Sequence, residues 1–232
     1  MTFDHLTSLG LTEKQLKDFS SYRQMLLQWN SQVNLTAITE PAEVEIKHFL
    51  DSLLLRQCSL WTGRGKVADV GSGAGFPGLP LKIVSPEIAL DMFEASGKRV
   101  KFLQELSGEL ALEDVRAFHL RAEEAGRQPD FRECYDWALS RAVAAMPVLL
   151  EYCLPFLRLG GFMAAYKGPG GREEAEEAKK AAALLGGRLV EVYEASLPME
   201  QGERSILIYQ KVAATPKSYP RRPGIPAKQP LK

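Results

Sequence analysis

The sequence has few cysteines and no long hydrophobic run. Its three cysteines, Cys58, Cys134 and Cys153, are odd in number and widely spaced, which suits neither a disulfide framework nor a zinc site. No run approaches the roughly 18 apolar residues that span a membrane. Asp4 stands where an export signal would carry positive charge, and no apolar stretch follows it. These absences predict a cytoplasmic protein with reduced thiols and no bound metal.

The chain also lacks an excess of charge, because its 29 basic residues equal its 29 acidic ones. A net charge of zero argues against a protein that coats nucleic acid non-specifically. The charges are unevenly distributed, however. Residues 215–232 contain five basic residues, five prolines and no acidic residue, so the preceding 214 residues have a net charge of −5. We therefore predict an acidic body with a basic, proline-rich C-terminal arm that is extended.

No internal repeat and no flexible glycine-serine linker divides the chain. Its 232 residues, 45% hydrophobic and 25% charged, are typical of a folded globular protein and favour a single domain. In the first 62 residues the apolar side chains have helical spacing. Thr12 and Gln15 form a capping-box pattern at the start of one helix, and Pro41 suits the first turn of a second. We expect residues 1–62 to form a helical extension packed on the main domain.

From residue 66 onward, short apolar runs alternate with helical patterns. This alternation is typical of βαβ units and of a mostly parallel sheet covered on both faces. The last two predicted strands have no clear helix between them, so we expect an antiparallel hairpin at the end of the sheet. Residues 63–214 are therefore predicted to form an α/β domain. The predicted strands are residues 67–70, 89–93, 115–120, 137–140, 162–166, 189–193 and 206–210, and the predicted helices are residues 79–84, 98–110, 146–157 and 173–185.

A glycine-rich loop follows the first predicted strand. It contains Gly71, Gly73, Gly75 and Gly78, and a helix pattern begins directly after it. Glycines permit positive φ angles and a close approach of the backbone to a ligand, and a helix N-terminus offers free N–H groups. The last three glycines match the dinucleotide-binding fingerprint. The first three, with Asp69 two positions earlier, instead resemble motif I of methyltransferases that use S-adenosylmethionine.

Two further positions help to choose between these cofactors. Glu94 ends the second predicted strand, and its carboxylate can accept hydrogen bonds from the ribose hydroxyls of either cofactor. Arg121-Ala122-Glu123 follows the third strand, where methyltransferases place a group near the adenine. The remaining chain is too short for a dehydrogenase with its own substrate domain. These features favour a methyltransferase with a Rossmann-like, seven-stranded sheet.

The chain as a whole resembles the 16S ribosomal RNA guanine-N7 methyltransferase family, also called glucose-inhibited division protein B. The resemblance extends over nearly the whole sequence and rests on an ordered set of motifs, not on the glycine loop alone. Those motifs are Trp29-Asn30, Asn34-Leu35-Thr36-Ala37-Ile38, His48-Phe49-Leu50-Asp51-Ser52-Leu53, the Asp69–Gly78 loop, Lys98-Arg99, Phe102-Leu103, Arg121-Ala122-Glu123, Ser140-Arg141-Ala142, Gly160-Gly161, Lys167-Gly168 and Tyr219-Pro220-Arg221-Arg222.

This resemblance implies a class I methyltransferase fold with a helical N-terminal extension. It implies metal-free transfer of a methyl group from S-adenosylmethionine to N7 of a guanosine in small-subunit ribosomal RNA, with S-adenosylhomocysteine as the second product. The loop glycines Gly71, Gly73, Gly75 and Gly78 are cofactor-binding candidates. The resemblance adds Phe76, Glu94, Ala95, Ser96, Ala122, Glu123 and Arg141 to that set. Several relatives carry Asp at the position of Glu94, whose longer side chain can still reach a ribose.

Guanine N7 has an in-plane lone pair and no proton at neutral pH, so it can attack the sulfonium methyl group without a general base. The sequence agrees, because it has no Pro-Cys pair for carbon methylation and no (Asn/Asp)-Pro-Pro-(Tyr/Phe) motif for methylation of an exocyclic amine. We predict catalysis by positioning alone. Arg141 is the candidate positioning residue, for the methionine carboxylate or for guanine O6, with an ordinary salt bridge as the alternative.

Basic residues near the expected ligand edge of the sheet are candidates for RNA binding. They are His48, Lys167, Arg204, Arg221 and Arg222. His48 and Asp51 could instead form a structural pair on one helix face. Removal of the C-terminal arm is expected to weaken RNA binding and to leave cofactor binding intact. No membrane or obligate protein partner is indicated, and two rival functions remain open: methylation of a small molecule, and RNA binding without catalysis.

Overall fold

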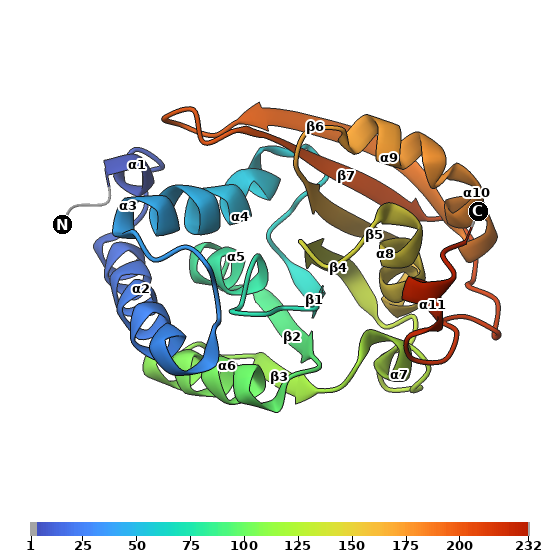
Figure 1. Ribbon diagram of the computed structural model, residues 1–232, viewed down its shortest axis with the longest axis horizontal. Helices are drawn as coiled ribbons and strands as arrows, with labels where there is room; N and C mark the ends of the chain where they lie inside the picture. Colours follow the sequence, from blue (N-terminus) through green and yellow to red (C-terminus); the bar gives the residue numbers. More distant parts are fainter. Residues whose placement is uncertain (1–3, 232) are drawn as a thin grey trace.

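The protein, described here by a computed structural model over residues 4–231, is built around a seven-stranded sheet (Figure 1). The strands are β1 (Gly65–Val70), β2 (Ile88–Glu94), β3 (Val115–His119), β4 (Tyr135–Arg141), β5 (Leu157–Lys167), β6 (Gly187–Ser196) and β7 (Glu203–Lys211). Their order is β3-β2-β1-β4-β5-β7-β6, and β7 alone runs in the direction opposite to the other six strands. The predicted parallel sheet and its terminal hairpin are confirmed.

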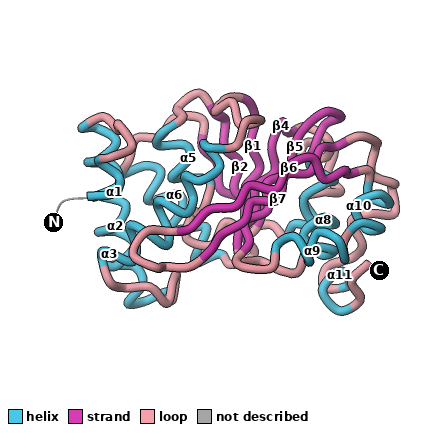
Figure 2. The backbone as a smooth tube through the Cα atoms, turned by 90° about the horizontal axis from the view of Figure 1, so that it is seen from above, coloured by secondary structure: helices cyan, strands magenta, loops and turns pink. Residues whose placement is uncertain are grey.

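Helices cover both faces of this sheet. They are α1 (Asp4–Thr7), α2 (Glu13–Val33), α3 (Pro41–Val44), α4 (Asp51–Leu53), α5 (Gly78–Val84), α6 (Gly97–Glu109), α7 (Ala122–Ala125), α8 (Met146–Cys153), α9 (Gly171–Glu177), α10 (Lys179–Leu185) and α11 (Ile225–Lys228). Figure 2 shows α2, α5 and α6 on one side of the strands and α8, α9 and α10 on the other. Across residues 4–231 there is no helix with the length and apolar character needed to cross a membrane.

Burial on both faces explains why the strands read as short, continuous apolar runs. Val67 of β1 belongs to the core under α2, α5 and α6, whereas its neighbours Ala68 and Val70 belong to the core under α8. All three side chains are almost completely buried. Because successive side chains of a strand point to opposite faces, a strand between two helix layers favours apolar residues on both faces.

The N-terminal helices pack on the α5–α6 layer and on the glycine loop. The predicted capping box is present at the start of α2: Thr12 Oγ1 accepts the Gln15 N–H (3.2 Å), and Gln15 Oε1 accepts the Thr12 N–H (2.9 Å). Later in α2, the buried Tyr22 hydroxyl donates a hydrogen bond to the Ala74 carbonyl of the glycine loop (2.6 Å). The second helix begins at Pro41 and passes through a π-helical turn, Glu45–Leu50, into α4.

Two helices are shorter than their apolar patterns indicate. The helix expected over residues 146–157 ends at Cys153, and a 3-10 turn, Leu154–Phe156, leads into β5. Pro155 lacks the N–H group that another α-helical turn would need. The helix expected over residues 173–185 is divided at Ala178 into α9 and α10. Cys134, unlike the buried Cys58 and Cys153, is exposed because it lies in the loop directly before β4.

The C-terminal segment, residues 215–231, folds against the main domain, so the expectation of an extended arm is wrong. Thr215, Pro220 and Pro226 are buried, and α11 lies beside α8 (Figure 1). Side chains of the main domain bind the backbone of this segment and its Arg221. Those partners are distant in sequence, so the composition of the segment alone gave no sign of them.

Candidate active site

The glycine loop leaves β1 next to β4, where the strand order reverses and where open α/β sheets bind ligands. Gly71, Gly73 and Gly75 have φ angles of +74°, +57° and +95°, which residues other than glycine rarely adopt. A Cβ atom at Gly71 would lie 2.6 Å from Val143 Cγ2, and one at Gly75 would lie 2.6 Å from the Tyr22 hydroxyl. A Cβ atom at Gly73 would meet nothing closer than a carbonyl oxygen at 4.0 Å. The loop is therefore closely packed at two glycines and open at Gly73.

Asp69 joins the first residue of α5 to β1. Its buried Oδ2 accepts the Gly78 N–H (3.0 Å), and a Cβ atom at Gly78 would lie 2.6 Å from that oxygen. Burial raises the pKa of Asp69 to about 7, opposed by the Gly78 hydrogen bond and by the charge of Arg141. Gly75 and Gly78, both nominated for cofactor binding, thus have a packing role within the loop.

Glu94 ends β2 beside the loop and is only 6% exposed. Its Oε2 accepts the Gly73 N–H (3.0 Å), and its Oε1 accepts the Ser96 N–H (2.8 Å). The Arg99 guanidinium lies 3.9 Å from Oε2. Each carboxylate oxygen has two lone pairs, so both oxygens can accept a further hydrogen bond. Glu94 is therefore held in a fixed orientation and can still bind the hydroxyl groups of a ligand.

The cavity beside this loop, here called the loop pocket, has a volume of about 410 Å³, which suits a small-molecule ligand. Five of the nominated cofactor-binding residues line it: Gly71, Glu94, Ala95, Ala122 and Glu123. Three other lining residues escaped the sequence analysis: Tyr152, Gly224 and Ala227. They come from α8 and from the C-terminal segment, and no local pattern connects those elements to the glycine loop.

Arg141, another nominated cofactor-binding residue, lines a second cavity, and the nominated Phe76 packs against its guanidinium group. The Phe76 ring stacks on Tyr22 and on His48, with ring centres 5.3 Å and 4.5 Å apart. The Arg141 guanidinium carbon lies 4.9 Å from the centre of the same ring, within the range of a cation–π contact. Ser96, which is also outside the lining of the loop pocket, contributes its backbone N–H to Glu94. The Phe76 ring thus packs against both the Arg141 guanidinium group and the His48 ring.

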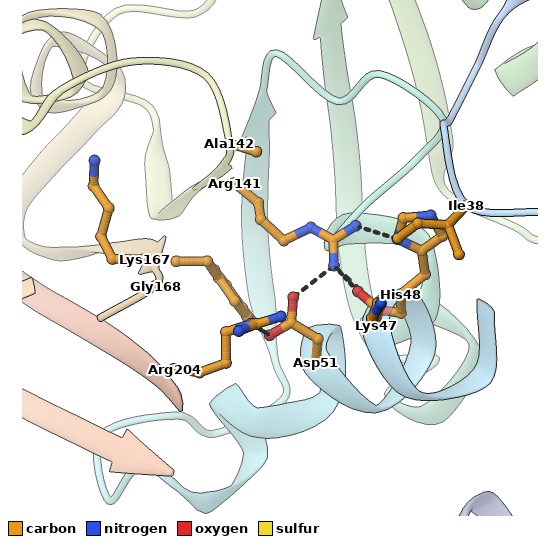
Figure 3. Close-up of a pocket in the computed structure, with 10 residues that line it drawn as sticks. Ile38, Lys47, His48, Asp51, Arg141, Ala142, Lys167, Gly168 and Arg204 are labelled. Carbon is orange, nitrogen blue, oxygen red and sulfur yellow. Dashed lines mark hydrogen bonds and ion pairs between the residues drawn. The ribbon is translucent and has the colours of Figure 1, made fainter. Parts of the chain in front are cut away.

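The second cavity, here called the arginine pocket, is lined by His48, Asp51, Arg141 and Arg204 and has a volume of about 350 Å³ (Figure 3). Arg141 Nη1 donates to Asp51 Oδ2 (2.8 Å) and to the Lys47 carbonyl (3.1 Å). Arg204 Nε lies 3.1 Å from Asp51 Oδ1. Asp51, only 4% exposed, is thus paired with two arginines. Its single negative charge leaves one positive charge uncompensated among these three residues, which favours anionic ligands.

His48 adopts a neutral form in the arginine pocket. Its Nδ1 lies 3.1 Å from Arg141 Nη2, and a guanidinium N–H can only donate, so we assign Nδ1 as the acceptor and place the ring proton on Nε2. Nε2 then donates to Thr36 Oγ1 (2.8 Å). Burial, followed by the positive charge of Arg141, lowers the pKa of His48 from 6.5 to about 3. Both ring nitrogens are therefore occupied, and the ring adds no charge at neutral pH.

The depressed pKa of His48 predicts an effect of pH on stability. The folded-state pKa of about 3 lies below the ordinary histidine pKa of 6.5, so this group's contribution to stability is complete above pH 6.5 and is lost as the pH falls toward 3. NMR titration of the His48 ring resonances should show no protonation near pH 6.5, and the same titration in urea-unfolded protein supplies the reference. A midpoint near 6.5 in folded protein would contradict the assigned hydrogen bonds.

Ala142 separates the two pockets. It follows β4 directly, has a φ angle of +57°, and lines both the loop pocket and the arginine pocket. Ligands in the two pockets would therefore lie next to each other across a single residue.

Lys167 also lines the arginine pocket, but Figure 3 shows its side chain pointing away from Arg141 and Asp51. Its Nζ donates to the Ala144 carbonyl (2.8 Å) and pairs with Glu174 (2.7 Å).

The structure brings together three of the five nominated RNA-binding residues, since His48, Lys167 and Arg204 all line the arginine pocket. The other two, Arg221 and Arg222, lie on the C-terminal segment. Arg221 is bound to Glu151 (2.6 Å), whereas the side chain of Arg222 is exposed. Asp51 was named only as a possible partner of His48, and its pairing with two arginines was not expected.

The sheet topology and the loop define a class I methyltransferase fold. Among solved structures, P. horikoshii TYW2 in complex with MeSAdo is similar, with a TM-score of 0.55 and 16% identity over 75% of this chain and 64% of that one. A putative methyltransferase from Bacillus halodurans aligns with a TM-score of 0.54 and 14% identity over 71% of this chain and 100% of that one. At these identities the likeness shows the fold.

Sequence comparison identifies the family. The family model described as rRNA small subunit methyltransferase G matches residues 15–206. Curated relatives bear the same name: one from Alkaliphilus metalliredigens is 47% identical over 96% of this chain and 93% of its own length, and one from Moorella thermoacetica is 46% identical over 99% and 95%. The chain therefore belongs to the rRNA small subunit methyltransferase G family, as its motifs indicated.

Proposed function

We propose that this protein transfers the methyl group of S-adenosylmethionine to N7 of a guanosine in 16S ribosomal RNA of the small subunit. One observation carries the proposal: the loop pocket, with its carboxylate at Glu94, adjoins the positively charged arginine pocket at Ala142. A cofactor in the first pocket would lie next to a nucleotide in the second. The relatives' shared name supplies the substrate class, and this role would place the protein in the cytoplasm with the ribosomal subunits.

The residues of the loop pocket fit S-adenosylmethionine. Glu94 has lone pairs left for ribose hydroxyls, and Leu120 and Ala122 offer apolar surface for an adenine ring. The open space at Gly73 leaves room for a ligand beside the loop, and a side chain at that position would fill it. S-adenosylmethionine, when bound, would supply an electrophilic methyl group on a sulfonium sulfur.

The arginine pocket would act by orientation and not by acid–base chemistry. His48, its only imidazole, is neutral, and both ring nitrogens are engaged with Arg141 and Thr36, so it is not placed to remove a proton. Guanine N7 needs no such base. Holding two reactants in the reactive geometry can supply roughly 7–11 kcal/mol of the barrier. Positioning of the two reactants is thus the main contribution of this chain to catalysis.

Arg141 is the residue best placed to orient a ligand. Asp51, His48 and the Lys47 carbonyl all bind its guanidinium group, so the side chain is fixed before any ligand arrives. A guanidinium group has five N–H donors in a rigid plane, which suits either guanine O6 or the methionine carboxylate of the cofactor. Methyl transfer moves positive charge from the sulfur to the guanine, and the carboxylate of Asp51 keeps the net charge of this environment low.

A direct test uses S-adenosylmethionine with a radiolabelled methyl group, unmodified small ribosomal subunits, and nucleoside analysis of the digested RNA. We expect label in 7-methylguanosine, and no label when Gly73→Val protein, in which the open space beside the loop is filled, replaces the wild type. Label in another nucleoside would refute the N7 assignment. Cofactor binding without RNA labelling would favour a small-molecule acceptor, and absence of cofactor binding would refute the methyltransferase role.

A further inference from the structure

The C-terminal segment runs from the end of β7 to the wall of the loop pocket. Its first residue is fixed in place: Thr215 Oγ1 donates to the Leu185 carbonyl (2.8 Å) and accepts a hydrogen bond from the buried Lys211 ammonium. The Thr215 N–H donates to Glu133 Oε1 (3.1 Å). The direction in which the segment leaves the sheet is therefore determined by side chains of the main domain.

Two arginines of the main domain then bind the backbone of the segment. Arg132 donates to the carbonyls of Thr215 (2.7 Å) and Tyr219 (2.9 Å). Arg127 Nε donates to the Pro220 carbonyl (2.7 Å). Hydrogen bonds from a charged donor are stronger than those between neutral groups. These contacts hold the backbone of the segment in one path along the main domain.

Arg221 makes the most extensive contact of the segment. Glu151 of α8 is completely buried, and its carboxylate accepts the Arg221 backbone N–H (2.7 Å), Nε (2.9 Å) and Nη2 (2.6 Å). A buried carboxylate without its partner is strongly unfavourable, so this bidentate ion pair holds the segment against α8. Arg221 was nominated as an RNA contact, but its guanidinium group is directed inward.

Three residues beyond Arg221, the segment reaches the loop pocket. The Gly224 N–H donates to Glu123 Oε1 (2.9 Å), and Gly224 and Ala227 line the pocket together with Ala122 and Glu123. Glu123, only 4% exposed, was itself nominated for cofactor binding. Arg221, which pairs with Glu151, is thus only three positions before Gly224, which binds Glu123 at the pocket wall.

We propose that residues 215–231 form a wall of the cofactor pocket, and that Arg221, held by Glu151, is a positioning residue that keeps Gly224 against Glu123. The inference deepens the proposed function and rests on the loop pocket being the cofactor site. It reverses the expectation that loss of the C-terminal segment would leave cofactor binding intact. In this arrangement Arg221 contributes to cofactor binding by holding the pocket wall. Only the exposed basic residues of the segment are left as candidates for RNA binding.

The test compares Arg221→Ala with Lys217→Ala, which removes one exposed positive charge from the same segment. Calorimetric titration with S-adenosylmethionine should show affinity weakened about tenfold in Arg221→Ala, as expected if the wall is in place only about a tenth of the time, and changed less than about twofold in Lys217→Ala. Arg221→Lys, which keeps the charge but loses the planar fork, should be intermediate. Thermal unfolding establishes that each variant is folded.

Two further readouts separate this role from RNA contact. In Arg221→Ala the KM for S-adenosylmethionine should rise while kcat at saturating cofactor and the KM for ribosomal subunits stay near wild type. Hydrogen exchange of residues 219–228 should be slowed by S-adenosylhomocysteine in the wild type. Unchanged cofactor affinity in folded Arg221→Ala, or a rise only in the KM for subunits, would overturn the inference alone. Wild-type protein that binds no cofactor would overturn the proposed function together with it.

Discussion

Replacement of Glu94 by alanine is expected to weaken S-adenosylmethionine binding by at least about 100-fold, because two hydrogen bonds from ribose hydroxyls to a carboxylate would be lost at about 1.5–3 kcal/mol each. The substitution also removes the acceptor that holds the Gly73 and Ser96 N–H groups, so the loop itself loses its support. Calorimetric titration of the folded variant with S-adenosylmethionine measures the loss directly.

Two variants calibrate this result. Glu94→Asp keeps the carboxylate on a shorter side chain and should retain most of the affinity, since a carboxylate remains to accept the ribose hydroxyls. Glu105→Ala removes a carboxylate from the exposed face of α6, where it pairs only with Lys101 at 3.8 Å, and should leave cofactor binding unchanged. If Glu94→Ala bound the cofactor as tightly as Glu105→Ala, Glu94 would not contact the ribose.

Replacement of Arg141 by alanine is expected to lower the methylation rate at saturating cofactor by about 100-fold, the usual consequence of misplacing a reacting group by about 1 Å. The variant should also lose about 3 kcal/mol of stability, near the low end for a broken buried ion pair, because Arg204 still pairs with Asp51. Single-turnover methylation of small subunits and urea unfolding measure the two effects separately.

A matched arginine on the surface provides the control. Arg172 forms an ion pair of similar length with Glu194 (2.8 Å), but both side chains are more than half exposed. Arg172→Ala should therefore leave the free energy of unfolding nearly unchanged, because exposed ion pairs contribute little to stability, and the variant should methylate normally. Full activity in folded Arg141→Ala would remove Arg141 from the mechanism.

The parts of this protein that sequence reasoning predicted are those that neighbouring residues specify. The capping box at Thr12 and Gln15 forms within one helical turn, and each strand of the sheet carries its own apolar run. The glycines of the loop were found because positive φ angles at Gly71, Gly73 and Gly75 require that residue type locally. Glu94 was found from its place at the end of the second predicted strand, the family motifs added Ala122 and Glu123, and the structure places all three at the loop pocket.

The errors have the same physical origin. The proline content of residues 215–231 indicated an extended arm, because proline and charge favour exposure when a segment is considered alone. The segment is folded because Glu151, Arg127 and Arg132, all more than 60 residues away, have buried or backbone-directed groups that bind it. Likewise, the spacing of His48 and Asp51 predicted a shared helix face but not that Arg141 and Arg204 would meet there.

By itself, then, the sequence determined the strand and helix pattern, the ligand loop and the family, because each is encoded by local spacing or by motifs in order along the chain. The tertiary structure alone decided which charges are neutralised by partners and which face a pocket. Arg221 and Arg222 are adjacent basic residues, yet Arg221 is turned inward to a buried carboxylate and Arg222 is exposed. Electrostatic pairing depends on distance in space, and only the folded chain sets that distance.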